Sequence, residues 1–378
     1  MRVLHVINDL AVGGAETVLY RLATYPSDTQ HEVICIESRA AYSEQLERRG
    51  ISVHHLEWAS LAASPGAWLR LVRLIKLANA DIVQTWMYRS NIVGGLAAKR
   101  SKVPVVWNIR CSSVAPLRPA SRILARVGGY LTGVVPSRIV NCSVASAEIH
   151  KQLGYDPADV VVIANGYDSE AYCPDEHARQ RTRKQLGIGA ETFAMGAIGR
   201  WDPAKGYPVL LKAMRQLADR GLNFRLLLIG PGLESSNAEL SRLIEKAGCG
   251  NFVRTLGYRA DVPDLARAMD LHVLASLTEG FPNVIAETML SGTPNVATDV
   301  GDSAIIVGSS GWTVPVGDAE RLADAIEQAH SEWGAHTDLW RDRQEAARRH
   351  IAENFALDQM VKAYEKIWEQ VARGDGLS

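Results

Sequence analysis

Two stretches of the sequence carry side chains that could act on phosphates and hydroxyl groups. In the first, GRWDPAKGYPVL, Arg200 and Lys205 stand five residues apart in a turn that Pro203 and Gly206 would shape. A forked guanidinium and a compact ammonium group in one loop suit a diphosphate. The alternative is that both are ordinary surface charges.

The second stretch, LTEGFPNVIAETMLSGTP (277–294), predicts a helix that begins at Pro282 and ends at Ser291–Gly292. The free N–H groups at its start would attract an anion, yet Glu279 and Glu287 flank this end. Carboxylates fit beside an anion site when they accept hydrogen bonds from hydroxyl groups on either side of a diphosphate. A nucleotide sugar has such hydroxyls on its ribose and on its hexose. The alternative is that Glu287 is a plain helix surface residue.

A third turn, NDLAVGGAE (8–16), follows the first expected strand. Gly13–Gly14 would let the backbone approach a ligand closely at the start of a helix. A plain tight turn is an equally good interpretation. No G-x-G-x-x-G motif occurs, so the sequence does not predict a dinucleotide site.

These turns need a scaffold, and the sequence predicts parallel sheets. Short β-rich runs alternate with helical patterns throughout, which is typical of right-handed βαβ units. Ligands of such sheets bind at the carboxyl ends of the strands, where these turns would lie. The expected strands are 2–7, 31–36, 51–56, 81–86, 103–109, 137–142 and 160–165, followed by 193–199, 224–230, 251–257, 270–276, 295–298 and 311–316.

The length of 378 residues, with one break in the alternation, predicts an α/β protein of two doubly wound, Rossmann-like domains facing a central cleft. We expect the domains at 1–170 and 191–355, and the polar stretch 171–190 as their connection. The end of the chain, from Ala352 through the tail 356–378, predicts one long amphipathic helix.

Composition narrows the function classes. The chain is 47% hydrophobic and 22% charged, with a formal net charge of −1, as in a soluble globular enzyme. No run of 18 apolar residues predicts a membrane span, and MRVLHVINDL reads as a first strand rather than a signal peptide. Five scattered cysteines without a C-x-x-C motif favour a reducing compartment. The expected location is the cytoplasm, with a peripheral position on the inner face of the cytoplasmic membrane as the other option.

Charge is unevenly distributed along the chain. Residues 58–147 contain 12 Lys or Arg and a single acid, Asp81. Two segments in this block predict amphipathic helices with a basic side that suits an anionic membrane surface. Their basic residues are Arg70, Arg73 and Lys76 in 65–78, and Arg118, Arg122 and Arg126 in 115–131. The alternative is a helix packed on its own sheet with solvated arginines. No nucleic-acid-binding module is recognisable.

Together, these motifs resemble family 4 of the retaining glycosyltransferases, which have the GT-B fold. EGFPNVIAE matches the family's E-x7-E motif, and the likeness extends to GGAE, GRWDPAKG, SGTP, TDVGDSA and the terminal helix. In that fold the terminal helix crosses back towards the first domain. The resemblance implies a bacterial hexosyltransferase that uses a nucleotide-diphosphate sugar, with UDP favoured over GDP. Its acceptor would be a saccharide or a polyprenyl-diphosphate-linked saccharide in polysaccharide or glycolipid synthesis. The alternatives are a catalytically silent GT-B binding module and a nucleotide-sugar epimerase.

The resemblance also implies residue roles. Arg200 and Lys205 would bind the diphosphate and stabilise the leaving nucleotide. Glu279 would accept hydrogen bonds from the donor sugar, and Glu287 from the ribose. Arg200, Lys205 and Glu279 are the expected catalytic residues. The expected donor-binding set is Gly14, Arg200, Lys205, Tyr258, Arg259, Glu279, Gly280, Phe281, Asn283, Val284 and Glu287.

Some positions depart from the family pattern. Arg110 stands where many relatives have a histidine, and Ile305 where the family often has a glutamate. Arg110 is expected on the acceptor side, together with Trp86 and Tyr88. These two rings suit stacking on a sugar, and packing in the core is an equal alternative.

Neither a metal nor a cofactor is expected. The chain has no D-x-D pair of the kind that holds a divalent ion on a diphosphate, and no H-E-x-x-H cluster. Retention could use a carboxylate nucleophile, but both glutamates are assigned to hydroxyl groups. We therefore expect front-face displacement, in which the departing phosphate oxygen takes the acceptor proton.

Overall fold

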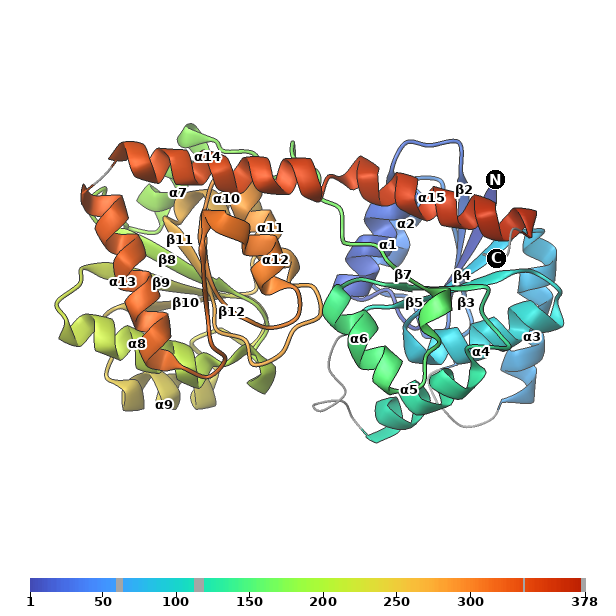
Figure 1. The fold of residues 1–378 in the computed structure, drawn as a ribbon. Helices are drawn as coiled ribbons and strands as arrows, with labels where there is room; N and C mark the ends of the chain where they lie inside the picture. Colours follow the sequence, from blue (N-terminus) through green and yellow to red (C-terminus); the bar gives the residue numbers. More distant parts are fainter. Residues whose placement is uncertain (59–63, 112–118, 336, 375–378) are drawn as a thin grey trace. The chain divides into compact units, whose positions relative to one another are not determined.

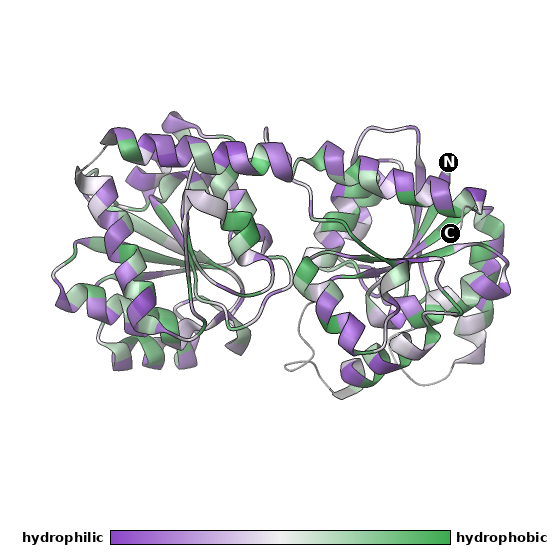
Figure 2. Cartoon of the chain, viewed as in Figure 1, coloured by the Kyte–Doolittle hydropathy of each residue, from purple (hydrophilic) through white to green (hydrophobic). Residues whose placement is uncertain are grey.

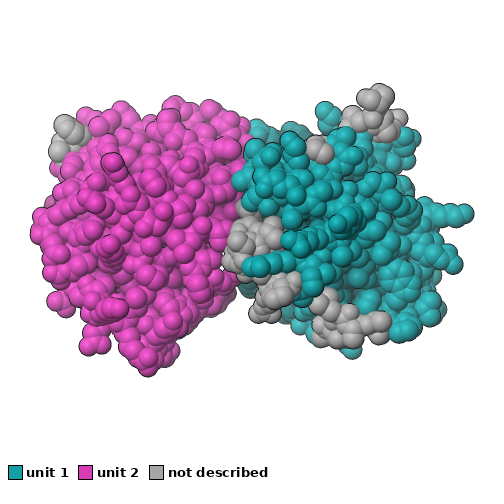
Figure 3. Space-filling model, turned by 60° about the horizontal axis from the view of Figure 1, so that its bottom comes forward, with its two compact units in different colours: residues 1–166, 357–378 teal, residues 167–356 magenta. Residues whose placement is uncertain are grey.

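The structure is a computed structural model of the full chain that describes residues 1–58, 64–111, 119–335 and 337–374. Arg118, expected on a basic helix, lies outside these residues. The chain divides into two compact units (Figure 3). Unit 1 comprises Met1–Gly166 and Leu357–Ser378, and unit 2 comprises Tyr167–Ala356.

Unit 1 is built on a seven-stranded parallel sheet with strand order β3-β2-β1-β4-β5-β6-β7 (Figure 1). One face packs against α1, α2 and α15, and the other against α3, α4 and α5. The strands are β1 (Arg2–Ile7), β2 (Gln30–Cys35), β3 (Ser52–His55), β4 (Ile82–Trp86), β5 (Val105–Ile109), β6 (Arg138–Asn141) and β7 (Val160–Val162). The helices are α1 (Gly14–Thr24), α2 (Ala41–Arg48), α3 (Pro65–Ala78), α4 (Met87–Arg100), α5 (Pro119–Leu131), α6 (Val144–Gln152) and α15 (Leu357–Arg373).

Unit 2 has a six-stranded parallel sheet with strand order β10-β9-β8-β11-β12-β13. The strands are β8 (Phe193–Ile198), β9 (Phe224–Ile229), β10 (Val253–Gly257), β11 (Leu271–Leu274), β12 (Asn295–Thr298) and β13 (Trp312–Val314). The helices are α7 (Glu176–Gln185), α8 (Tyr207–Asp219), α9 (Ala238–Ala247), α10 (Val262–Ala268), α11 (Asn283–Leu290), α12 (Ser303–Val307), α13 (Ala319–Ala335) and α14 (Thr337–Asn354).

Every expected strand is present, within a few residues of its expected ends. The central strands are buried along their whole length, as is usual for parallel sheets covered on both faces, and they are mostly apolar. In Figure 2 the strands inside each unit are mostly green, whereas purple residues lie on the outer sides of the helices.

The expected connection at 171–190 is not a separate segment. The boundary between the units lies at Gly166–Tyr167, and α7 falls within the expected connection but belongs to unit 2. Leu186 and Ile188, which follow α7, are buried against β8 and β9 residues of the unit 2 core. The many charged residues of α7 concealed this role in the sequence.

The prediction of one helix from Ala352 onward is also wrong. Helix α14 ends at Asn354 and α15 begins at Leu357. Between them, the Phe355 carbonyl accepts a hydrogen bond of 2.9 Å from the Tyr167 N–H, so the chain is extended there. Helix α15 then joins the core of unit 1, as expected for the terminal helix. Its Trp368 indole N–H donates to Gln84 on β4 at 2.8 Å.

A buried ion pair joins α7 to the sheet of unit 2. One Asp270 oxygen accepts from Arg183 at 3.0 Å and from the Ala194 N–H at 2.8 Å. Arg179 donates to the other oxygen. The side chains of Arg183 and Asp270 are only 8% and 2% exposed.

Replacing Asp270 with alanine should lower the free energy of unfolding by about 3 to 5 kcal/mol, because it leaves the Arg183 charge buried without its carboxylate. Chemical denaturation measures the change. The matched control is Asp219→Ala, which removes the carboxylate of an exposed pair with Arg215 and should cost less than about 1 kcal/mol. Equal losses in the two variants would contradict the role given to Asp270.

Candidate active site

The turn after β8 carries Lys205 to the carboxyl end of β11. Asp202 starts a short 3-10 turn (Pro203–Lys205) by accepting the Ala204 N–H at 2.9 Å. Gly206 follows with φ of +65°, and a Cβ there would lie 2.0 Å from the Ala275 carbonyl oxygen. Only glycine allows this approach without a clash, and it fixes the turn beside the end of β11.

Lys205 and Glu279 meet at this edge. The Lys205 Nζ donates to Glu279 Oε1 at 2.6 Å, and the Ser276 hydroxyl donates to the same oxygen at 2.6 Å. The two charged side chains are 22% and 13% exposed. From the sequence, Lys205 and Glu279 are expected to bind different groups of one ligand, and in the structure the two side chains are in direct contact.

Arg200 lies on the same turn but reaches into solvent. Its side chain is 69% exposed, and its Nε donates to Asp202 at 3.1 Å. The backbone beneath it is fixed, because the buried Tyr207 hydroxyl donates to the Arg200 carbonyl at 3.2 Å. Burial, and then the carboxylates of Glu279 and Asp202, raise the pKa of Tyr207, so this hydroxyl stays protonated.

The loop from Glu279 leads into α11, which starts one residue later than expected. Pro282 is the N-cap, Asn283 is the first helical residue, and no side chain of the described residues caps this end. The first N–H groups of a helix have no partner within the helix. The Asn283 side chain accepts from the Tyr167 hydroxyl at 2.6 Å. Glu287 lies on the same helix and is partly buried.

The segment Gly280–Phe281 is held from two sides. Gly301 has φ of +55°, and a Cβ there would lie 2.4 Å from the Gly280 carbonyl oxygen. Phe281 is buried, with its ring centroid 5.8 Å from that of Phe355. The start of α11, including Val284, is therefore placed by close backbone packing.

Tyr258 and Arg259 follow β10, at the same edge of the sheet. Strand β10 is two strands away from β8, which is about 10 Å at the usual strand spacing. Tyr258 is largely exposed, and its N–H donates to Glu234 at 3.3 Å. Arg259 pairs with Asp261 at 2.7 Å. Their expected contact with a base stays a prediction.

In unit 1, Gly14 is the first residue of α1, and a carboxylate that the sequence analysis missed lies beside it. A Cβ on Gly13 would lie 2.3 Å from Glu16 Oε2, so the Glu16 side chain folds back over the Gly13–Gly14 turn. Burial raises the pKa of Glu16 to about 7, with Asp9 adding to the shift. In the structure Gly13 is the N-cap of α1, so Glu16 stands three residues after it, a common position for an acid at a helix start. The expected approach of Gly14 to a diphosphate stays a prediction.

Trp86 and Tyr88 are core residues, so no ring face is open for a sugar. Trp86 is fully buried, and its indole N–H donates to His5 at 3.2 Å. The Tyr88 hydroxyl lies 2.6 Å from Nε2 of His150. The core-packing alternative therefore holds, and the expectation of acceptor stacking is wrong.

Arg110 is held by its own unit. Its guanidinium donates to Asn165 and, at 3.3 Å, to the Tyr364 hydroxyl of α15. It also lies 5.7 Å from the centre of the Trp86 ring. Its expected contact with an acceptor stays a prediction.

With this geometry in place, comparison with known proteins identifies the family. The profile described as "Glycosyltransferase Family 4" matches residues 12–171, and that described as "Glycosyl transferases group 1" matches residues 192–332. A D-inositol 3-phosphate glycosyltransferase from Jonesia denitrificans is 32% identical over 309 residues, which are 76% of this chain and 72% of that protein. The chain belongs to the family 4 glycosyltransferases.

Other relatives and solved structures agree with this assignment. The UDP-Gal:alpha-D-GlcNAc-diphosphoundecaprenol alpha-1,3-galactosyltransferase of Escherichia coli is 25% identical over 274 residues, 71% of this chain and 70% of that protein. The crystal structure of Alr3699/HepE from Anabaena in complex with UDP matches with a TM-score of 0.85 at 24% identity, over 98% of this chain and all of that one. This likeness shows that the glycosyltransferase has the GT-B fold.

Among the described residues of this glycosyltransferase, no group of three or more His, Cys, Asp or Glu side chains is arranged to hold a metal ion. Of the helices among the same residues, none combines the length and apolar character that a membrane span requires.

Glu16 gives this transferase a testable pH dependence. A carboxyl whose pKa is raised from 4.5 to about 7 on folding contributes stability that is complete below pH 4.5 and is lost as the pH rises through 7. Glu16→Gln cannot ionise, so its free energy of unfolding relative to wild type should rise by up to about 3 kcal/mol between pH 4.5 and 8. Urea denaturation across this range measures the difference. Parallel pH profiles for the two proteins would contradict the burial of this carboxyl.

Proposed function

We propose that this glycosyltransferase is a retaining enzyme that transfers a hexose or N-acetylhexosamine from a UDP-sugar to a saccharide or lipid-linked acceptor. The observation that carries the proposal is the contact between Lys205 and Glu279 beside the uncapped start of α11. A cation, a helix N-terminus that no side chain of the described residues caps, and a carboxylate at one edge suit a diphosphate with a hydroxylated sugar attached.

The contact between Lys205 and Glu279 is compatible with a bound donor. An ammonium group has three donors and a carboxylate has about four acceptor sites, so each can keep its partner and add a ligand group. Lys205 would add a phosphate oxygen, and Glu279 a sugar hydroxyl. Glu287, farther along α11, would accept from the ribose. Ser276, which donates to Glu279, would keep the carboxylate oriented.

The nucleotide would lie along the carboxyl edge of the unit 2 sheet. From the turn after β8 to the end of β10 is about 10 Å, a distance that suits a diphosphate at one end and a base near Tyr258 and Arg259 at the other. The neighbour from Anabaena was crystallised with UDP and with UDP-glucose, which supports UDP as the nucleotide.

We propose front-face displacement without a metal. Glu279 already accepts hydrogen bonds from Lys205 and Ser276, so it suits a positioning role better than nucleophilic attack. The glycosidic phosphate oxygen would leave with its charge stabilised by Arg200, Lys205 and the α11 N–H groups. The same oxygen would take the proton of the acceptor hydroxyl as the new bond forms on the same face of the sugar.

The acceptor would be a saccharide or a polyprenyl-diphosphate-linked saccharide at an anionic membrane surface. The name of the E. coli relative includes a diphosphoundecaprenol-linked acceptor, which supports the lipid-linked class. In unit 1, α3 exposes Leu69 and Leu77 among its basic residues, and α5 exposes Ile123 and Tyr130. Exposed apolar side chains beside cations favour docking to an anionic bilayer.

The direct test incubates the protein with UDP-sugars alone, and then with a polyprenyl-diphosphate-linked sugar added. We expect a new glycosidic bond only in the complete mixture, with the donor's anomeric configuration kept in the product by NMR. Conversion of the donor without an acceptor would indicate an epimerase. A thermal shift with donor but no product under any condition would indicate a binding module.

Loss of either cation should impair the chemical step. Lys205→Ala and Arg200→Ala should each lower turnover by about a hundredfold, the usual effect of removing one preorganised charge contact with a leaving group. The control is Lys212→Ala, an exposed cation on α8, which should retain full activity. Near-normal turnover in either site variant would rule out its assignment to the diphosphate.

Charge reversal on α3 tests the membrane surface. The double variant Arg73→Glu/Lys76→Glu should bind vesicles of phosphatidylglycerol and phosphatidylcholine at least tenfold more weakly, since each cation near such a surface contributes about 1 kcal/mol. Co-sedimentation measures binding, with Lys212→Glu in unit 2 as the control. Absence of wild-type binding at low salt would point to an acceptor free in solution.

A further inference from the structure

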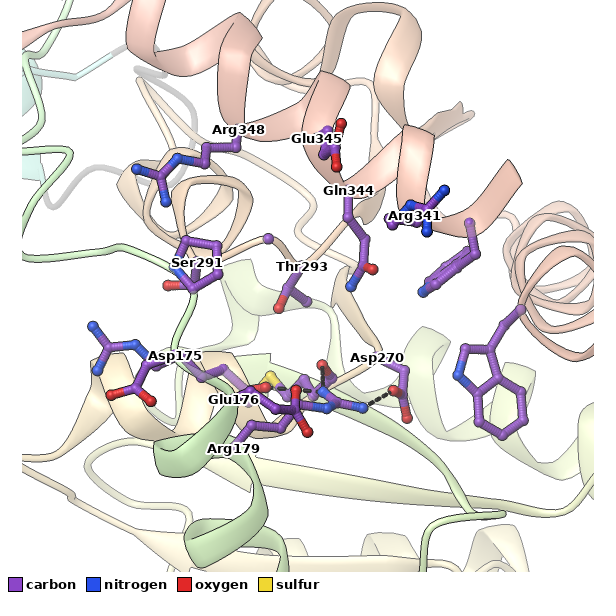
Figure 4. Close-up of a pocket in the computed structure, with 16 residues that line it drawn as sticks. Asp175, Glu176, Arg179, Asp270, Ser291, Thr293, Arg341, Gln344, Glu345 and Arg348 are labelled. Carbon is purple, nitrogen blue, oxygen red and sulfur yellow. Dashed lines mark hydrogen bonds and ion pairs between the residues drawn. The ribbon is translucent and has the colours of Figure 1, made fainter. Parts of the chain in front are cut away.

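Unit 2 contains a cavity of about 530 Å³ that no part of the proposed mechanism uses (Figure 4). The segment Ser291–Thr293, between α11 and β12, lines it together with the start of α7 and one side of α14. This segment precedes β12, and Asp270, also in the lining, precedes β11. The cavity therefore lies at the amino edge of the parallel sheet, opposite the edge that holds Lys205. Its volume is that of an ordinary small-molecule site.

The floor of the cavity contains two arginines, Arg179 and Arg267, whose guanidinium groups already donate hydrogen bonds within the protein. Arg179 donates to the carbonyls of Arg267 and Met269 at 2.9 and 2.7 Å, and also to Asp270. Arg267 in turn donates to the Cys173 carbonyl at 2.7 Å. These guanidinium groups hold the structure together and are not available to attract an anion.

One wall, by contrast, carries polar side chains that face no partner. Gln344, Glu345 and Arg348 line the cavity from α14, and their side chains make no hydrogen bond or ion pair within the part of the chain that the structure describes. In Figure 4 the Gln344 side chain extends from α14 towards the floor, and Arg348 reaches towards Ser291. An amide, a carboxylate and a guanidinium together offer both donors and acceptors.

Two tryptophans contribute to the lining, of which Trp333 is partly exposed and Trp340 is almost fully buried. Trp333, near the end of α13, and Trp340, near the start of α14, both line the cavity. The Trp340 ring stacks on Trp312, with centroids 6.4 Å apart, and the Trp333 ring lies 5.2 Å from Phe193. Both indoles are therefore held in place before any ligand arrives.

We propose that this cavity is a second, non-catalytic site for a neutral saccharide. Four acids in the lining, Asp175, Glu176, Asp270 and Glu345, balance its four arginines, so neither an anion nor a cation is favoured. A sugar ring matches the remaining chemistry, because its hydroxyl groups both donate and accept and its C–H face can pack on the partly exposed Trp333 indole. The site is independent of which donor the active site uses.

NMR titration tests this with maltose, cellobiose and diacetylchitobiose as probes, in the presence of saturating UDP. The readout is the indole N–H signal of Trp333, assigned with a Trp333→Phe variant. We expect at least one disaccharide to shift this signal at millimolar concentration. Gln344→Ala and Arg348→Ala should each weaken the binding at least fivefold. The matched control is Arg349→Ala, the next residue of α14, which is exposed and does not line the cavity.

Three results would overturn the proposal. The first is that no disaccharide shifts the Trp333 signal up to tens of millimolar, and the second is that the Gln344 and Arg348 variants bind as tightly as wild type. The third is that glucose 1-phosphate binds more tightly than the neutral sugars. The outcome does not depend on the proposed function. If UDP failed to bind the active site, the Trp333 shift and its loss in the α14 variants would be unaffected.

Discussion

The close approach of Gly206 to the Ala275 carbonyl is the constraint on which the candidate site at the carboxyl edge of unit 2 depends. A positive φ and the absence of a side chain let the turn after β8 touch the end of β11. This contact places the Lys205 ammonium on the Glu279 carboxylate, and Ser276 at the strand end orients the same oxygen. A larger residue at 206 would separate the turn from the strand and would break this group of three side chains. The charges of the site are thus positioned by backbone packing rather than by their attraction for each other.

Both edges of the unit 2 sheet carry arginines, but the arginines differ in exposure and in the number of their hydrogen bonds. At the carboxyl edge, α8 and α11 begin without a side-chain cap among the described residues, and Arg200 points into solvent. At the amino edge, Arg179 and Arg183 are saturated by carbonyls and by Asp270. A guanidinium that is fully bonded stabilises the fold, whereas an exposed one can bind a phosphate, so charge alone does not identify the functional edge.

The strands could be predicted from the sequence because the pattern that identifies a strand lies within the strand itself. A strand buried on both faces is a short and mostly apolar run, and such runs are visible without knowledge of the rest of the chain. The loops of the candidate site were visible for a similar reason, since Arg200, Lys205 and Glu279 lie in strand-to-helix turns and Glu287 follows on α11.

The predictions that were wrong or missing concern features that depend on distant contacts. The charged helix α7 belongs to unit 2 because Arg183 meets Asp270, which is 87 residues away. The Trp86 ring is buried because α15 returns to the sheet. Glu16 was missed because its importance comes from folding over Gly13, which only the side-chain geometry reveals.

Arg110 shows how a departure from the family pattern can be read through its contacts. Its guanidinium bonds to Asn165, which follows β7, and to Tyr364 on α15, while it lies over Trp86 at the end of β4. Asn108, two residues earlier on β5, donates to the same Tyr364 hydroxyl at 2.8 Å. Tyr364 is fully buried, so its hydroxyl needs these partners.

A guanidinium can reach three elements at once, which a shorter imidazole cannot. In this chain the position therefore links the terminal helix to the carboxyl ends of β4 and β5, which is where parallel sheets of this kind present ligands. Ile305, the other departure, is half exposed on α12, and nothing in the structure explains it.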